Sequence, residues 1–196
     1  MLTGARAVHL CIDMQRIFAE ETQWHTPTLF DIVPNIARIV AGKPGHTIFA
    51  RFTVPHTPDL ATGSWQTYYH RWSSLTGANL APGMIDLVEP LAALAESEEI
   101  FDKPTYSLFG ENSLDQRLRA RKADTLIITG VETDICVLAT VFDAVDLGYR
   151  VILVRDAVTS SSLESHKATL ELVLPRMPQQ IIIAGTADVV GSWSPA

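Results

Sequence analysis

Short apolar runs recur along the chain, and residues that favour turns bound each of them. Runs of three to six residues are too short for helices, and most of them lack the alternation of a strand with one solvent-facing side. Such runs are typical of strands buried on both faces of a parallel sheet. The sequence therefore predicts strands at Ala7–Ile12, Thr47–Ala50, Glu99–Phe101, Thr125–Thr129, Arg150–Val154 and Gln180–Ala184.

Stretches with helical spacing of apolar positions lie between these runs. They are Phe30 to Val40, Ile85 to Leu94, Ser113 to Arg121, Ile135 to Leu147 and Leu163 to Leu174. Gly148 is expected to cap the fourth helix, and Pro175 to end the fifth. Strands and helices alternate, so right-handed crossovers place helices on both faces of the sheet. We expect a three-layer α/β/α sandwich with a doubly wound, mainly parallel six-stranded sheet, whose strand order the sequence leaves open.

Length, charge and the absence of long apolar segments narrow the class of protein. A chain of 196 residues without a recognisable linker is expected to form a single domain over residues 1–196. The net charge of −7 argues against nucleic-acid binding, which needs clustered Lys and Arg, and favours a small-molecule substrate. No apolar run approaches the ~20 residues of a membrane span, and the first residues lack the pattern of a cleavable leader. A cytoplasmic protein with no membrane partner is expected.

Residues at the ends of strands are the first candidates for chemistry, because ligands of open α/β sheets bind beyond the carboxyl ends of the strands. Asp13 follows the first run, Lys103 follows the third, and Cys136 follows the fourth through Gly130. Each has a simpler interpretation when taken alone. Asp13 could only cap a helix, Lys103 could be a solvated surface lysine, and Cys136 could be a core residue.

The two cysteines cannot form a disulfide framework and differ in their setting. Cys11 lies inside a strand and is expected in the core. Cys136 lies in the segment GVETDICV, residues 130–137, where the glycine permits a tight turn and Thr133 or Asp134 can cap the next helix. The thiol would then lie in the first helical turn, where free N–H groups and the helix dipole favour a thiolate and could hold an oxyanion.

Three motifs together resemble the isochorismatase-like cysteine hydrolases, which include nicotinamidases, N-carbamoylsarcosine amidohydrolases and ureidoacrylate or biuret amidohydrolases. The motifs are IDMQ at residues 12–15, KPTYSLF at 103–109 and GVETDICV at 130–137, and RDA at 155–157 also fits. They occur in the right order over nearly the whole chain, and their joint spacing is more specific than any one of them. The resemblance implies a Rossmann-like hydrolase fold, a small amide, ureido or carbamoyl substrate, and a homo-oligomer, either a dimer or a tetramer.

The resemblance also implies roles for individual residues. Asp13 would be the general base, Lys103 the cation that orients it and lowers the thiol pKa, and Cys136 the nucleophile that forms a thioester. Isochorismatases proper lack this cysteine, so its presence favours acyl transfer from an amide. The backbone features that the resemblance implies are an oxyanion hole at Ile135 and Cys136 and a cis peptide between Val131 and Glu132.

One departure from the family concerns metal binding. Nicotinamidases hold a metal with an Asp-x-His pair after the second strand, whereas this chain has RFT at residues 51–53. His56 and His70 remain, and two isolated histidines are interpreted as pocket or surface groups. We expect no metal and no cofactor. The alternatives are a metal-dependent nicotinamidase-like hydrolase and a non-catalytic binding or assembly domain; a nucleotide-binding domain is disfavoured, because no glycine-rich loop follows the first strand.

The stretch from residue 52 to 84 lacks clear periodicity and is rich in aromatic residues, so a functional loop is expected there. Its aromatic side chains, Tyr68 among them, either line a pocket or pack a subunit interface. The residues expected to line the substrate pocket are Phe18, Trp65, Tyr69, Trp72 and Tyr106.

Overall fold

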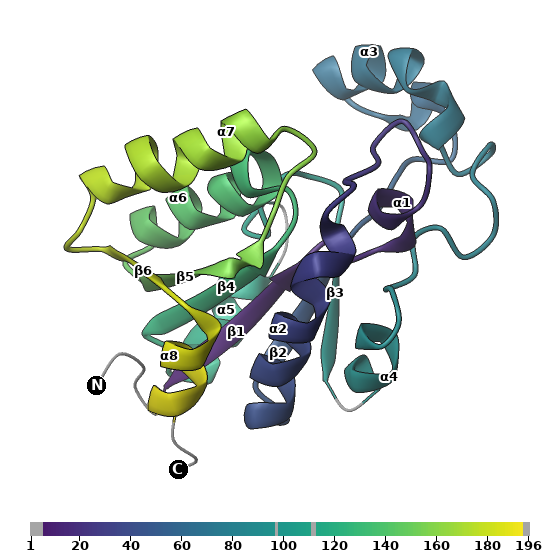
Figure 1. Cartoon of the computed structure of the whole chain (residues 1–196). Coiled ribbons are helices and arrows are strands. Elements are labelled where there is room, and N and C mark those ends of the chain that lie inside the picture. Colours follow the sequence, from purple (N-terminus) through teal and green to yellow (C-terminus); the bar gives the residue numbers. More distant parts are fainter. Residues whose placement is uncertain (1–5, 97, 111–112, 194–196) are drawn as a thin grey trace.

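A parallel sheet forms the centre of the molecule, with the strand order β3-β2-β1-β4-β5-β6 (Figure 1). A computed structural model describes residues 6–96, 98–110 and 113–193. Every pairing between neighbouring strands is parallel, which confirms the doubly wound sheet. The strands are β1 (Ala7–Ile12), β2 (Thr47–Phe52), β3 (Glu99–Lys103), β4 (Thr125–Gly130), β5 (Arg150–Val158) and β6 (Ile181–Ala184).

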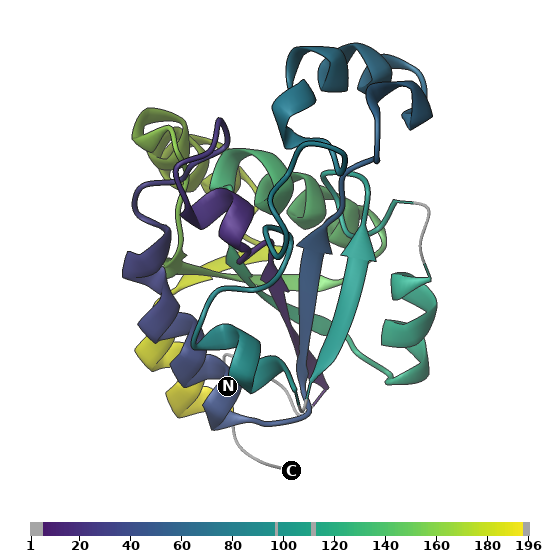
Figure 2. The ribbon, with the colours of Figure 1, turned by 90° about the vertical axis from the view of Figure 1, so that its right-hand side faces the viewer.

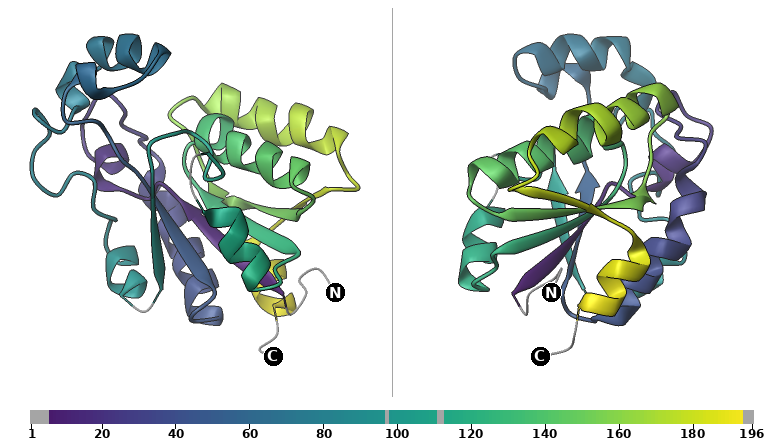
Figure 3. Two further views of the ribbon diagram at one scale, coloured as in Figure 1. Left: turned by 180° about the vertical axis from the view of Figure 1, so that it is seen from behind. Right: turned by 60° about the vertical axis from the view of Figure 1, so that its left-hand side comes forward.

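Helices cover both faces of this sheet (Figure 3). In β1, Cys11 points into one apolar core, whereas Leu10 and Ile12 point into the other, as the period of two along a strand requires. One face carries α2 (Leu29–Gly42), α4 (Leu91–Ala95) and α8 (Thr186–Ser192). The other face carries α5 (Leu114–Ala120), α6 (Leu138–Asp146) and α7 (Leu163–Ala168).

Several helices differ from the sequence-based prediction. The prediction of a helix from Ile85 to Leu94 is wrong in its first half, because α4 begins only after Pro90. The residue before a proline is disfavoured in helical conformation. The helix after β5 continues beyond α7 as a π turn and a 3-10 turn, so Pro175 lies inside the last turn instead of beyond it. The elements without a sequence signal are α1 (Arg16–Ala19), α3 (Ser64–Arg71), α8, and the 3-10 turns η1 (Pro58–Leu60) and η2 (Ser73–Leu75).

The strand order reverses at β1, which has β2 on one side and β4 on the other. In doubly wound sheets such a switch point opens a crevice beyond the carboxyl ends of the two strands. Gly130 brings these ends together, since a Cβ atom there would lie 2.0 Å from the carbonyl oxygen of Ile12. The absence of that atom lets the Val131 N–H donate to the same oxygen at 3.0 Å. The segments after β1 and β4 are therefore fixed side by side.

The segment that contains α3 lies beyond the carboxyl ends of the strands. Figure 2 shows the arrows of β2 and β3 pointing toward it. The aromatic stretch at residues 52 to 84 thus lies at the end of the sheet where the crevice opens. Among the described residues, no helix has the length and apolar character needed to cross a bilayer.

Candidate active site

Asp13 lies at the turn that ends β1. Its φ of 53° is left-handed, a conformation that aspartate tolerates better than most residues. Its N–H donates to the Ala50 carbonyl at 3.1 Å. The side-chain amide of Gln15 ties the same turn to β2, because its Nε2 donates to the Phe52 carbonyl at 3.1 Å and its Oε1 accepts from the Phe52 N–H at 2.7 Å. Asp13 does not cap a helix, because α1 begins after Gln15 and its N-cap accepts no side-chain bond. Its carboxylate is instead fully buried at the switch point.

Lys103 is the last residue of β3, and its side chain reaches Asp13 at the end of β1, although β2 lies between the two strands in the sheet. Its Nζ donates to Asp13 Oδ2 at 2.8 Å and to the Thr105 carbonyl at 3.0 Å. The ring of Phe52 lies 4.8 Å from the ammonium group. Both side chains of the ion pair are 0% exposed, so the interpretation of Lys103 as a solvated lysine is wrong.

Cys136 lies in a π turn, η3 (Thr133–Val137), that leads into α6. Its position in the first turn agrees with the sequence, but neither predicted cap is formed: the Thr133 hydroxyl bonds His166 Nδ1 at 2.9 Å, and Asp134 accepts from Ser160. Cys136 is 6% exposed and reaches a pocket, whereas Cys11 is fully buried in the core. Only Cys136 is accessible to a substrate.

The three groups perturb one another's protonation. Burial raises the pKa of the Cys136 thiol; Lys103 opposes this and Asp13 reinforces it. Burial also raises the pKa of Asp13 against the effect of Lys103. Burial alone would lower the pKa of Lys103, but Asp13 and Cys136 together outweigh this effect and the pKa is raised. Lys103 thus acts on the thiol in the expected direction, but desolvation is the larger effect and the pKa of Cys136 lies above its usual value.

One carboxylate oxygen of Asp13 remains available for proton transfer. Among the described residues, none gives Asp13 Oδ1 a hydrogen bond of ordinary geometry, although Cys136 lies near enough for each group to shift the other's pKa. Lys103 holds the second oxygen, Oδ2. The arrangement thus pairs a protonated thiol with a fixed base that has one free acceptor atom.

The backbone before Cys136 bears on the expected oxyanion hole. The peptide bond between Val131 and Glu132 is cis, at the position that the resemblance implies. The Ile135 N–H donates to the Glu132 carbonyl at 3.1 Å, and so does the Val137 N–H. The Ile135 N–H could donate to an oxyanion only after its hydrogen bond to the Glu132 carbonyl had broken. The oxyanion hole at Ile135 and Cys136 stays a prediction.

A pocket of about 350 Å³ opens at Cys136. Phe18, Trp72 and Tyr106 line it as predicted. Trp65 and Tyr69 instead line a neighbouring pocket, and the Trp65 ring packs 4.7 Å from the Tyr106 ring. The remaining lining residues are the aromatic Trp24, Phe52 and Tyr68 and the polar or aliphatic Gln23, His25, Glu132, Ile135 and Ser161.

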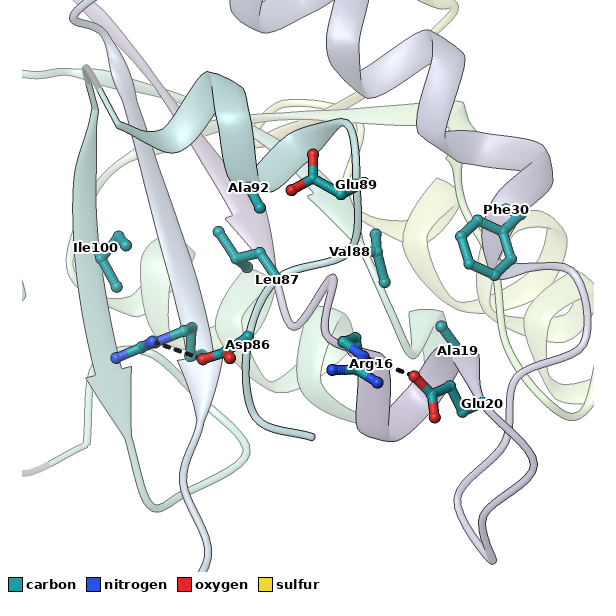
Figure 4. A pocket seen from close by; sticks show the side chains of 11 residues that line it. Arg16, Ala19, Glu20, Phe30, Asp86, Leu87, Val88, Glu89, Ala92 and Ile100 are labelled. Atoms are coloured by element: carbon teal, nitrogen blue, oxygen red, sulfur yellow. Dashed lines mark hydrogen bonds and ion pairs between the residues drawn. The ribbon is translucent and has the colours of Figure 1, made fainter. Parts of the chain in front are cut away.

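A larger pocket of about 680 Å³ lies beside α1 and α4, and Figure 4 shows charged side chains along it. Arg16 pairs with Glu20 at 2.6 Å, and Arg51 lies 3.9 Å from Asp86. None of the three groups described above lines this pocket. The smaller pocket is therefore the candidate active site.

The side chains do not fit the metal site of nicotinamidases. Arg51, at the position where that family pattern begins, makes a two-pronged ion pair with Asp102, at 2.7 and 2.9 Å. His56 is exposed, and His70 lies 3.5 Å from Asp59 on the surface. In residues 6–96, 98–110 and 113–193, no three His, Cys, Asp or Glu side chains gather closely enough to share an ion.

Sequence comparison relates the chain to known proteins. The model of the isochorismatase domain matches residues 7–185. The maleamate amidohydrolase of Pseudomonas putida is 37% identical over 98 residues, which are 46% of this chain and 46% of that protein. A probable inactive nicotinamidase of Arabidopsis thaliana is 30% identical over 167 residues, 82% of this chain and 84% of that protein. The chain spans about half the length of the first curated relatives that it matches.

Structural comparison agrees with the sequence. The crystal structure of a cysteine hydrolase from Pseudomonas syringae pv. phaseolicola matches with a TM-score of 0.78 and 26% identity. The match covers 95% of this chain and 92% of that one.

Proposed function

Because the chain belongs to the isochorismatase family of amidohydrolases, we propose that it hydrolyses the C–N bond of a small amide, ureido or carbamoyl compound through a thioester on Cys136. The observation that carries this proposal is the Lys103–Asp13 ion pair, which is fully buried and directs a free carboxylate oxygen to the only cysteine that reaches the pocket, among the described residues. A buried ion pair is costly to maintain, so a structural role alone explains it poorly.

The first half of the reaction forms the thioester. Asp13 Oδ1 takes the proton of the Cys136 thiol as the sulfur attacks the carbonyl carbon of the substrate. Because burial raises the pKa of the thiol, this proton transfer is placed together with the attack. The Cys136 N–H, with Ile135 if it releases the Glu132 carbonyl, would stabilise the oxyanion. Asp13 then returns the proton to the leaving nitrogen, and ammonia or an amine departs.

The second half regenerates the enzyme. A water molecule enters through the pocket, and Asp13 takes one of its protons as the oxygen attacks the thioester. The carbon–sulfur bond breaks, the acid product leaves, and the proton returns to Cys136. Lys103 stays charged throughout and keeps Asp13 in place, since its Nζ is held by both Asp13 and the Thr105 carbonyl.

A second candidate is a non-catalytic domain of the same fold, which the probable inactive relative in Arabidopsis thaliana favours. Ammonia release from a panel of neutral, cationic and anionic primary amides, ureas and carbamoyl compounds separates the two. We expect turnover of at least one compound by the wild type and by Cys11→Ala, and none by Cys136→Ala. No turnover of any compound would favour the non-catalytic domain.

A further inference from the structure

We propose that the pocket selects an amide whose non-reacting part is positively charged, such as a quaternary ammonium group, and that Glu132 and the aromatic walls provide this selectivity. The inference rests on the proposed amidohydrolase function and names its substrate class. It draws on three observations: the aromatic walls, the charges around the pocket, and the way Glu132 is held.

The aromatic walls surround the space next to the thiol. The Trp24 and Tyr68 rings lie 5.9 Å apart, and Tyr68 and Trp72 lie 6.3 Å apart. The Phe52 ring lies 5.8 Å from Trp24 and stacks on Tyr106 with centroids 6.4 Å apart. Aromatic faces carry negative electrostatic potential and attract ammonium groups, most strongly where water is excluded. A pocket of about 350 Å³ suits a small cation of this kind.

The charges around the pocket favour a cation over an anion. Glu132 is the only carboxylate among the described lining residues, and neither Lys nor Arg lines the pocket. Lys103 lies behind the Phe52 ring and is neutralised by Asp13. Arg71 stacks 5.1 Å from the Trp72 ring but is outside the wall. A carboxylate substrate such as maleamate, the substrate in the name of one relative, would find His25 as the only basic side chain among the described lining residues.

Glu132 is oriented without being neutralised. Its Oε1 accepts a hydrogen bond from the Ser161 N–H at 2.9 Å and from the Thr26 hydroxyl at 3.4 Å. No described residue donates to Oε2, and Glu132 forms none of the ion pairs found among the described residues. The carboxylate is therefore not paired with any cation of the described residues and can contact one in a ligand.

The test compares two amides of the same shape. Trimethylammonioacetamide carries a cation, and 3,3-dimethylbutanamide replaces the nitrogen by carbon; succinamate serves as the anion. We measure kcat/KM for each at pH 8, where histidine side chains in general are neutral. The ratio of the cationic to the neutral amide should fall about five- to tenfold in Glu132→Gln, because one partly desolvated charge pair is lost. Comparing ratios cancels the different intrinsic reactivities of the two amides.

Glu164→Gln is the matched control, since Glu164 is an exposed carboxylate on α7 outside the pocket. It should leave the ratio unchanged. A ratio equal in the wild type and Glu132→Gln, or faster hydrolysis of succinamate than of the cation, would overturn the inference while leaving the amidohydrolase proposal intact.

Binding decides the question if no amide is hydrolysed, or if Glu132→Gln does not fold. The Kd of each amide is then measured on Cys136→Ser by quenching of the fluorescence of the pocket tryptophans, Trp24 and Trp72. Tighter binding of the cation than of its neutral isostere supports the inference. Equal or weaker binding of the cation overturns it, independently of any turnover.

Discussion

Replacement of Lys103 by methionine is the perturbation whose cost the structure defines most clearly. Lys103 Nζ and Asp13 Oδ2 lie 2.8 Å apart with both side chains fully buried. Lys103→Met leaves a buried carboxylate whose Oδ1 already lacks a hydrogen bond from any described residue. Removing one partner of a buried ion pair costs about 3–5 kcal/mol of unfolding free energy, because the remaining charge is uncompensated. We expect a loss of this size at pH 7.

The pH dependence of this loss has a definite sign. Burial raises the pKa of Asp13, and Lys103 opposes that shift, so Lys103→Met raises the pKa further. An acid whose pKa is higher in the folded than in the unfolded state weakens the fold as pH rises above its unfolded value, about 3.9. The unfolding free energy of the variant should therefore fall furthest below that of the wild type at neutral pH. Near pH 4 the difference between the two should become small.

Urea unfolding at pH 7 and pH 4 measures both effects. The double variant Lys103→Met with Asp13→Asn removes the unpaired charge and should regain most of the lost stability at pH 7. Lys167→Met, at an exposed lysine on α7, should change stability by no more than about 0.5 kcal/mol. The reasoning is refuted if the double variant is as unstable as Lys103→Met, or if the deficit does not shrink in acid.

Three further predictions concern the junction of β1 and β4 and the thiol. Gly130→Ala should cost about 3 kcal/mol or more in thermal or urea unfolding, because its Cβ would meet the Ile12 carbonyl oxygen at 2.0 Å. Gly148→Ala, also at positive φ but with no atom within 4 Å, should cost only about 1 kcal/mol; equal losses would contradict the argument. The rate of Cys136 alkylation by iodoacetamide should still rise between pH 7 and 9, since burial raises the thiol pKa, and a plateau below pH 7 would be inconsistent with this. Asp13→Asn and Cys136→Ala should each remove nearly all turnover, and combining them should cost little more; a large additional loss would show that the two residues act independently.

The sequence predicted the strands because they depend on local pattern, whereas the candidate reactive groups were singled out by the joint resemblance of three motifs. Runs of apolar residues located each strand, and the residue after a strand marked the crevice where Asp13, Lys103 and Cys136 meet. The strand order was open, since it depends on the faces to which the crossover helices pack. The helices α3 and α8 gave no periodic signal because each buries a single large apolar side chain, Tyr69 and Val189.

Side-chain direction and desolvation were the features that the sequence could not supply. Trp65 and Tyr69 turn away from the pocket, whereas Phe52, at the end of β2, and Trp24, in the loop before α2, turn into it. Aromatic composition alone does not distinguish these orientations. The pKa of Cys136 likewise depends on how completely the fold excludes water around the thiol, and this burial raises it. The position at a helix terminus, taken by itself, predicted a lowered pKa.

The most direct test of the proposed mechanism is the intact mass of the protein during turnover. An amide that the enzyme hydrolyses is mixed with stoichiometric protein, quenched in acid within the first turnover, and analysed by mass spectrometry with peptide mapping. A thioester mechanism predicts a mass increase equal to the acyl group, on the peptide that contains Cys136, in the wild type and in Cys11→Ala. Undiminished hydrolysis by Cys136→Ala, or an adduct on Cys11 instead, would contradict it.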